Sequence, residues 1–400
     1  MIFLGFLRCR LLKKGGCMQD TKKTKVTFFI SDMIIGGTET VFVDTINELL
    51  NASDFDLRIV TKTRIREPLY VNWLRSHPET QVYVYYPLHN FFESLKKYCK
   101  VFPLENLRKI IFSLYKKYRR LLVNLTGRLK DADILIDYKN FEFSRELKHC
   151  HQKKIAWLHC AVSYCEDTLL NYVPQYDKIV VVTDEFIKIC KKKYPQIVDK
   201  LVHIYNPVNV KAIQDKAKYA KVPEGKYFCH VARLVDGKDV NTVLDSFEIF
   251  YKKHKDFHLY IIGDGDKACV FKKHAESLNS RKNIIFTGSL DNPYGFMSGA
   301  TANILSSEHE GFGMVLVESM ALSVPIISSN YKCGANEILN KGKYGYLFEI
   351  GNAKDLAKCM ESVVKNKVDA QNRAKQALVS LSRFSVNKTA QQIMELVINE

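Results

Sequence analysis

The sequence predicts an α/β protein built from two doubly wound, Rossmann-like domains of parallel strands that face each other across a cleft. Its 400 residues exceed the roughly 250 to 300 residues at which a single hydrophobic core stops growing. Short apolar runs alternate with helical patterns, which is typical of parallel strands covered on both faces. The same alternation restarts after Asn206-Pro207. Two domains of one class are therefore expected.

The apolar runs place the strands. In the first domain they are 25–31, 57–61, 134–138, 154–159, 178–183 and 201–206, and in the second 227–233, 258–265, 283–289, 301–307 and 325–330. Helical patterns cover 241–253, 267–278 and 370–400. We expect an extension over 1–24, a first domain over 25–206, a second over 207–375, and a helix over 376–400 that crosses back to the first domain.

The stretch EHEGFGMVLVESMAL places Glu310 and Glu318 around a Gly-Phe-Gly turn, with Glu318 among apolar residues. An ionised side chain without a partner is costly there. Glycines before a helix let backbone N–H groups approach an anion such as a diphosphate. At 1.5 Å per residue the two carboxylates lie about 12 Å apart, and they could hold hydroxyls on two rings that flank a phosphate bridge. The alternative is a pair of solvated glutamates, which leaves the glycines and the apolar surroundings unexplained.

Arg233 and Lys238 are the candidate cations for a diphosphate. They lie five residues apart between a strand and a helix, and they could stabilise a diphosphate leaving group without a metal. Cations on a loop are more often simply solvated. Gly36 and Gly37 form a second glycine loop directly after the first strand. No P-loop and no complete dinucleotide fingerprint occurs, which disfavours NAD binding.

His159 ends a strand of the first domain, where it could meet a sugar hydroxyl, although a single histidine is more often structural. Two pairs of aspartates, Asp131 with Asp133 and Asp264 with Asp266, imitate the D-x-D metal motif. We interpret both pairs as surface loop residues. No metal and no other resident cofactor is therefore expected.

Together these motifs resemble retaining glycosyltransferases of family 4, which have the GT-B fold. They are GG after the first strand, H-V-A-R-L-x-x-x-K, I-I-G-D-G, F-T-G, and E-G-F-G-x-x-x-x-E-S-M-A followed by P-I-I-S-S. The resemblance runs from Lys25 to the last helix. It is most specific between Glu310 and Ala321, which fit the E-x7-E signature of that family.

The resemblance implies a nucleotide-sugar donor, with UDP expected as the nucleotide. Glu310 would grip hydroxyls of the donor sugar and Glu318 those of the ribose. Arg233 and Lys238 would clamp the diphosphate, and His159 would lie near the transferred sugar, with less support from its neighbours. The other residues implied to contact the donor are Gly36, Gly37, Gly311, Phe312, Gly313 and Met314.

The implied reaction is retaining. The acceptor attacks the face of the sugar that the diphosphate leaves, and a phosphate oxygen takes the acceptor's proton. Neither a protein nucleophile nor a metal is required. The catalytic candidates are Glu310, Arg233, Lys238 and His159.

The formal net charge of +17 is concentrated in the first half of the chain. The segment 93–130 has eleven basic and two acidic residues around a helical apolar pattern. Each Lys or Arg near an anionic leaflet contributes roughly 1 kcal/mol. The segment predicts either a membrane-facing surface for a lipid-linked acceptor or a solvated basic helix with an apolar core face.

Eleven scattered cysteines without metal-type spacing indicate reduced thiols and a cytoplasmic protein. No run of about 18 apolar residues occurs, so no membrane span is expected. We expect a peripheral enzyme at the inner face of the plasma membrane that extends a glycan for lipopolysaccharide, capsule or a related polymer. A sugar-nucleotide epimerase or phosphorylase of the same fold is the alternative. A nucleic-acid-binding protein is more remote, because no reader motif is present.

Overall fold

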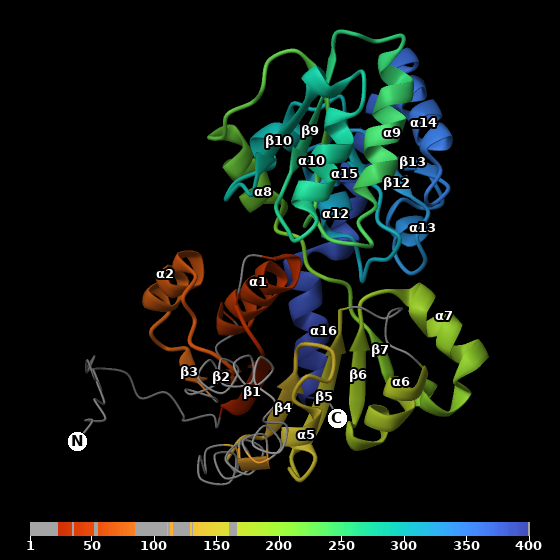
Figure 1. The fold of residues 1–400 in the computed structure, drawn as a ribbon. Helices are drawn as coiled ribbons and strands as arrows, with labels where there is room; N and C mark the ends of the chain where they lie inside the picture. The colour runs from red at the N-terminus through yellow and green to blue at the C-terminus, as the bar shows by residue number, and fades with distance from the viewer. Residues whose placement is uncertain are drawn as a thin grey trace.

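The computed structural model describes residues 23–33, 36–51, 55–84, 110, 113–114, 129, 131–159 and 166–398. This part of the chain forms two lobes, each a parallel sheet covered by helices (Figure 1). The first lobe contains strands β1 to β7 and the second β8 to β13. The predicted fold class is confirmed.

The first sheet has seven strands in the order β3-β2-β1-β4-β5-β6-β7, and all neighbours are parallel. Its core strands are buried on both faces, because helices cover both sides of the sheet. The strands are β1 (Thr24–Ile30), β2 (Phe55–Thr61), β3 (Gln81–Val84), β4 (Ile134–Asp137), β5 (Lys153–Leu158), β6 (Lys178–Val181) and β7 (Leu201–His203). The helices are α1 (Gly37–Asn51), α2 (Pro68–Ser76), α5 (Ser144–Leu147), α6 (Glu166–Tyr172) and α7 (Asp184–Lys193), with short 3-10 turns η1 (Val173–Gln175) and η2 (Pro195–Lys200).

The second sheet has six parallel strands in the order β10-β9-β8-β11-β12-β13. The strands are β8 (Lys226–Val231), β9 (Phe257–Ile262), β10 (Ile284–Gly288), β11 (Ala302–Leu305), β12 (Ile326–Ser329) and β13 (Tyr346–Phe348). The helices are α8 (Val210–Lys218), α9 (Val240–Tyr251), α10 (Ala268–Glu276), α11 (Tyr294–Ser298), α12 (Met314–Ala321), α13 (Ala335–Ile338), α14 (Ala353–Lys365) and α15 (Lys367–Ser380), with the 3-10 turn η3 (Arg281–Asn283).

In both sheets the strand order reverses once. In the first sheet β1 pairs with β2 on one side and with β4 on the other, and in the second β8 pairs with β9 and with β11. Ligands of open parallel sheets bind beyond the carboxyl ends of the strands at such a reversal. The loops after β1 and β4, and those after β8 and β11, therefore define where a site is expected.

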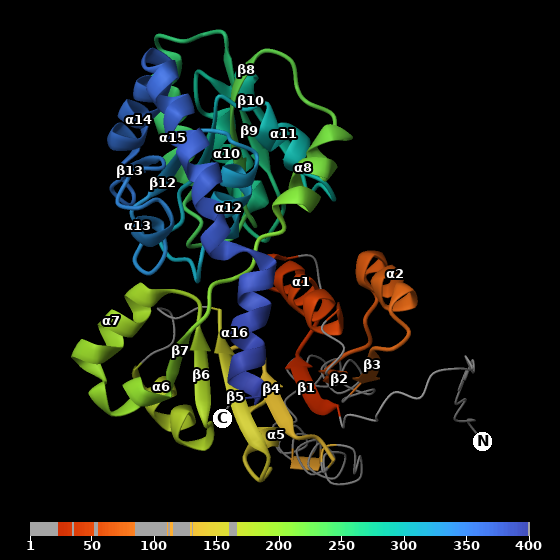
Figure 2. The same cartoon turned by 180° about the vertical axis from the view of Figure 1, so that it is seen from behind.

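The C-terminal part of the chain crosses back to the first lobe, as predicted, but not as one continuous helix. The structure divides the helical pattern 370–400 into α15, the 3-10 turn η4 (Leu381–Phe384) and α16 (Val386–Ile398). α15 packs on α12 and α14 of the second lobe, whereas α16 packs on α1 (Figure 2). The break lies where Val208 N donates to Phe384 O at 2.8 Å, because the two crossings of the chain run side by side there. The returning helix begins ten residues later than expected, and the domain limits themselves stay a prediction.

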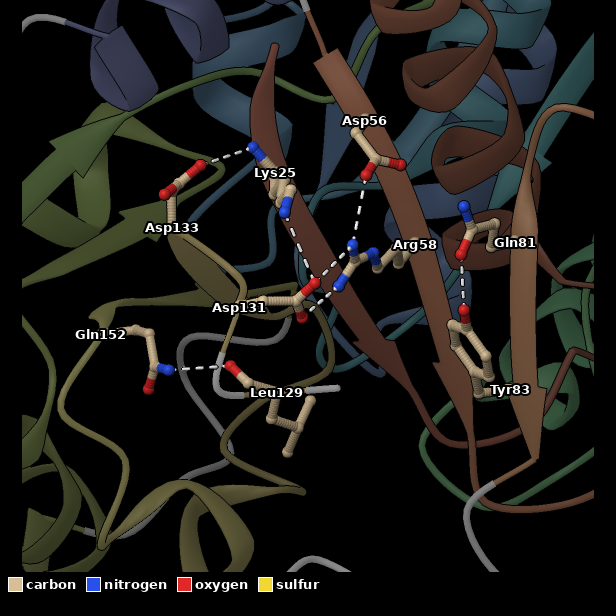
Figure 3. A network of polar contacts seen from close by, with 9 residues as sticks. All are labelled: Lys25, Asp56, Arg58, Gln81, Tyr83, Leu129, Asp131, Asp133 and Gln152. Carbon is tan, nitrogen blue, oxygen red and sulfur yellow. Dashed lines mark hydrogen bonds and ion pairs between the residues drawn. The ribbon is translucent and has the colours of Figure 1, made fainter. Parts of the chain in front are cut away.

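The first D-x-D pair, Asp131 and Asp133, lies at the amino-terminal ends of the strands of the first sheet. It is therefore opposite to the carboxyl ends, where a ligand is expected. Asp131 accepts hydrogen bonds from Arg58 at 2.7 and 3.1 Å, and Asp133 accepts one from the backbone N–H of Lys25 at 2.8 Å (Figure 3). The Arg58 guanidinium lowers the pKa of the Asp131 carboxyl. These contacts tie the start of β4 to β1 and β2, so we assign this pair to the sheet rather than to a ligand.

Two expectations from the sequence fall largely outside the described residues. The basic segment 93–130 is described only at 110, 113–114 and 129, and the extension 1–24 only at 23–24. Within the described ranges, none of the helices combines the length and the apolar character that crossing a membrane requires. Nor do three His, Cys, Asp or Glu side chains gather as a metal site in that part of the chain.

Candidate active site

Lys238 and Glu310 meet at the strand reversal of the second sheet. Lys238 lies in the loop after β8 and Glu310 in the loop after β11, and Lys238 Nζ lies 2.5 Å from Glu310 Oε1. Their side chains are only 18% and 17% exposed. Two further bonds join the loops: Ser306 Oγ donates to Lys238 O at 2.7 Å, and Glu308 N donates to Gly237 O at 2.9 Å. The structure thus brings together two residues that the sequence assigned to the donor site 72 positions apart.

Ser307 is a neighbour of this pair that the sequence reading missed. Its hydroxyl donates to Glu310 Oε1 at 2.7 Å, the same oxygen that Lys238 contacts. Within the described residues, Glu310 Oε2 has no hydrogen-bond partner and can accept from a ligand. A serine three positions before the glutamate, at the end of a strand, is the signal that could have identified it.

The Gly-Phe-Gly turn is held in place by Tyr331. Gly313 has φ 100° and ψ 60°, a left-handed conformation that favours glycine. A Cβ on Gly313 would lie 2.1 Å from the Tyr331 hydroxyl, which itself donates to Phe312 O at 2.8 Å. The helix starts only at Met314, so Glu310 precedes it. The estimate of 12 Å between the two glutamates, which assumed a helix throughout, therefore does not apply.

Glu318 has a partner, Tyr294, that the sequence did not reveal. The Tyr294 hydroxyl donates to Glu318 Oε1 at 3.3 Å. Burial raises the pKa of Glu318 from 4.5 to about 7, against the lowering effects of Tyr294 and of the Lys216 ammonium. A carboxylate with a pKa near 7 in an apolar helix is poised to gain from hydroxyl donors of a ligand.

Arg233 is exposed at the start of the loop after β8. Its side chain makes no hydrogen bond or ion pair with any residue that the structure describes, in contrast to that of Lys238. The structure therefore places the two predicted clamp residues on one loop without joining them. An anion at this strand reversal could be contacted by both.

Gly36 and Gly37 are brought against the glycine turn of the other lobe. A Cβ on Gly37 would lie 3.1 Å from Met314 Cγ, so the start of α1 packs on the start of α12. Asn206 Nδ2 also lies 3.9 Å from Met314 Sδ. The two glycine loops, more than 270 residues apart in the chain, thus meet at the boundary between the lobes.

A buried ion pair lies behind the Gly36 loop and was not predicted. Lys139, two residues after β4, lies 3.0 Å from Glu39 Oε1, and Glu39 is 4% exposed. The other Glu39 oxygen lies so close to Gly36 that a Cβ there would approach it to 2.7 Å. The strand reversal of the first sheet therefore also carries charge.

His159 lies at the carboxyl end of β5, but its environment is aromatic. Its ring centroid is 4.7 Å from that of Tyr138 and 6.1 Å from that of Trp157. Burial, together with the nearby Lys139 ammonium, lowers the pKa of His159 to about 3. The imidazole is therefore neutral at pH 7, and it can offer a hydrogen bond to a hydroxyl but not a positive charge.

Residues 212–378 match the family model of glycosyl transferases group 1. This match covers α8 to α15, and so it contains Arg233, Lys238, Glu310 and Glu318. The match covers less than half of the chain, and together with the two facing doubly wound sheets it makes the chain similar to group 1 glycosyltransferases of GT-B architecture. The resemblance inferred from the motifs is confirmed at this level.

The matches to curated relatives cover only part of the length of each relative. The chain is 26% identical over 268 residues to an uncharacterized glycosyltransferase of Haemophilus influenzae, a match that covers 65% of this chain and 73% of the relative. It is 24% identical over 190 residues to the N-acetylgalactosamine-N,N'-diacetylbacillosaminyl-diphospho-undecaprenol 4-alpha-N-acetylgalactosaminyltransferase of Campylobacter jejuni. That second match covers 47% of this chain and about half (51%) of the relative.

A solved structure matches nearly the whole chain. HepE from Anabaena, in complex with UDP and glucose, superposes with a TM-score of 0.72 at 17% sequence identity. The match covers 94% of this chain and 100% of the HepE chain. At this identity the likeness establishes the fold alone.

Proposed function

We propose that this protein transfers a hexose or an N-acetylhexosamine from a UDP-sugar to a hydroxyl group of a lipid-linked or lipopolysaccharide-type glycan. The observation that carries the proposal is the Lys238–Glu310 pair, which stands at the strand reversal beside a glycine turn and the start of α12. A matching group 1 family model and relatives named as glycosyltransferases support it.

The geometry suggests a division of labour in the donor site. Backbone N–H groups at the start of α12 and the cations Arg233 and Lys238 would bind the diphosphate. Glu310 would accept from hydroxyls of the donor sugar, and Glu318 from those of the ribose. When Lys238 turns to the diphosphate, the Glu310 carboxylate loses its ion pair and becomes a stronger acceptor for the sugar.

We further propose a retaining reaction that needs no metal. The bond between the anomeric carbon and the diphosphate oxygen breaks, a bond to the acceptor oxygen forms on the same face, and the acceptor's proton passes to a phosphate oxygen of the departing UDP. Arg233 and Lys238 would stabilise the charge that develops on the diphosphate. His159, being neutral, would orient a sugar hydroxyl.

Incubation with a panel of UDP- and GDP-sugars tests this proposal. The expected result is slow release of UDP from one donor, accelerated by a glycan acceptor, unaffected by EDTA, and giving a product whose anomeric configuration matches the donor in its NMR spectrum. Interconversion of one nucleotide sugar into another, without transfer, would instead establish the epimerase alternative. Thermal stabilisation by oligonucleotides and not by UDP would contradict both the transferase and the epimerase.

The peripheral membrane location is a separate proposal, and it rests on the basic composition of 93–130. Changing Lys116, Lys117, Arg119 and Arg120 to glutamine removes four positive charges. At roughly 1 kcal/mol each near an anionic surface, this should weaken binding to phosphatidylglycerol vesicles by two orders of magnitude or more. Sedimentation with vesicles measures the effect, and phosphatidylcholine vesicles are the control. Equal binding of variant and wild type would refute the membrane surface.

A further inference from the structure

A carboxylate of the second lobe caps a helix of the first. Glu337, on α13, accepts hydrogen bonds from the backbone N–H groups of Asp184 at 3.0 Å and Glu185 at 2.9 Å. These residues form the first turn of α7, whose N-cap residue Thr183 makes no capping bond with its own side chain. The bonds satisfy two backbone donors that a helix start leaves unpaired, and the helix dipole favours a negative charge there.

A second hydrogen bond joins the lobes with the roles exchanged, because here a carboxylate of the first lobe accepts from the backbone of the second. Glu185 Oε2 accepts from the backbone N–H of Cys333 at 3.0 Å. Cys333 has φ 62°, an unusual conformation for a residue with a side chain. Its fully buried thiol packs in the apolar cluster that contains Phe186 and Cys190 of α7. A segment of the second lobe is therefore inserted into the first and held there from both sides.

Three carboxylates, those of Asp184, Glu185 and Glu337, lie close together at this contact, and their negative charges are compensated by neighbouring groups. Asp184 is neutralised by Lys188 at 2.6 Å, and His203 Nε2 lies 3.8 Å from Glu337 Oε1. The Glu337 side chain is 14% exposed, so water screens it poorly. Backbone N–H groups on both sides compensate the charge of Glu185 and Glu337.

The inserted segment also contacts the candidate donor site. Two residues before Cys333, Tyr331 donates to Phe312 O and defines the space that only Gly313 can occupy. The next residue, Met314, packs against Gly37 of the first lobe. The segment 331–337 thus connects α7 to the glycine turn through backbone and side-chain bonds, and among the described residues it makes no hydrogen bond or ion pair with Glu310 or Lys238.

We propose that Glu337 and Glu185 are positioning residues for sugar transfer. Their reciprocal bonds fix the second lobe against α7, and through Tyr331 they set the place of the Gly-Phe-Gly turn relative to the first lobe. This inference rests on the proposed function for its catalytic consequence, but the contact itself can be measured without a substrate. Helices α7 and α13 thereby position the two lobes, a role that the donor-site residues do not share.

The substitution Glu337→Gln keeps the size of the side chain but leaves one α7 N–H without an acceptor. Amide hydrogen exchange at 184–185 should accelerate about tenfold or more, as expected for the loss of a hydrogen bond to a charged group. With the better of UDP-glucose and UDP-N-acetylglucosamine, kcat/KM should fall about tenfold or more, because small displacements are costly to catalysis. The dissociation constant of UDP should change less than about threefold, since the residues proposed to bind the nucleotide, Arg233, Lys238 and Glu318, all lie within the second lobe.

Glu185→Gln should reproduce these changes, and the double variant should be little worse than either single one, because both remove the same contact. Glu248→Gln is the matched control: Glu248 accepts from Ser280 N at 2.9 Å, a similar bond that lies wholly within the second lobe. Faster exchange with unchanged kcat/KM, a parallel loss of UDP affinity, or additive losses would overturn the positioning role. If no donor is turned over by the wild type, the proposed function fails, and the exchange measurement still decides whether the contact exists.

Discussion

Replacing Glu310 by glutamine should lower kcat for sugar transfer by about 100-fold or more, the usual cost of losing a preorganised charged group at a reacting centre. UDP should bind the variant at least as tightly as the wild type. The carboxylate lies 2.5 Å from Lys238 Nζ, so it competes with a diphosphate for that cation. Removing its charge frees Lys238 for the nucleotide, while the donor sugar loses its strongest hydroxyl acceptor.

Initial rates at saturating donor, combined with calorimetric titration of UDP, measure the two effects separately. Glu308→Gln is a suitable control, because Glu308 is exposed and lies two residues away in the same loop. Lys238→Met should change UDP binding in the opposite direction and weaken it. Full activity of Glu310→Gln, or loss of UDP binding in step with the rate, would show that Glu310 does not serve the donor sugar.

Replacing Glu318 by glutamine should weaken UDP binding about tenfold or more at pH 8, because a charged acceptor makes stronger hydrogen bonds to hydroxyls than a neutral one. The pKa of Glu318 is raised to about 7 by burial, with Tyr294 and Lys216 as its charged or polar neighbours. The wild type should therefore gain UDP affinity between pH 6 and pH 8 relative to the variant. Both proteins are titrated with UDP at both pH values. Comparing them at the same pH removes the contribution of the protonation of UDP itself, because it is the same for both.

The same substitution should stabilise the protein when no nucleotide is present. A carboxyl group with a higher pKa in the folded protein than in the unfolded chain takes up protons more readily when folded, so its ionisation opposes folding. The free energy of unfolding of the wild type therefore falls as the pH rises from about 4.5 through about 7. Glutamine avoids this loss, which amounts to at most about 3 kcal/mol and less after solvent screening.

Thermal unfolding checks this second effect. Glu318→Gln should melt at a higher temperature than the wild type at pH 8, and the difference should shrink severalfold at pH 5. Glu276→Gln, on the exposed face of α10, should show no such pH dependence. A variant that is less stable at pH 8 would mean that the Glu318 carboxylate contributes to folding and is not held for a ligand.

Local patterns were enough to predict strands β8 to β12 of the second lobe, although not the edge strand β13. Each of its central strands is a short apolar run whose residues are buried on both faces, as in β11 and β12. A parallel sheet covered by helices leaves no other place for such runs. The glycine turn was predictable for a similar reason, because Gly313 adopts a backbone conformation that side chains disfavour.

Partners that are distant in the chain were not predictable. Tyr294 reaches Glu318 across 24 residues, and Lys139 reaches Glu39 across 100. Neither tyrosine nor lysine carries a local signal of such a role. His159 shows the same limit, since its neutral state depends on burial against Tyr138 and on the nearby Lys139 ammonium.

The sequence by itself determined the fold class, the strands of both sheets except the edge strands β3 and β13, and the loops that carry Glu310, Lys238 and the glycines, because backbone preference and apolar periodicity act over a few residues. Only the tertiary structure decided which of these loops meet, where the returning helix begins, and how Glu337 and Glu185 join the lobes. Those contacts depend on the carboxyl edges of two sheets facing each other, and pairing between residues more than a hundred positions apart leaves no mark in a single chain.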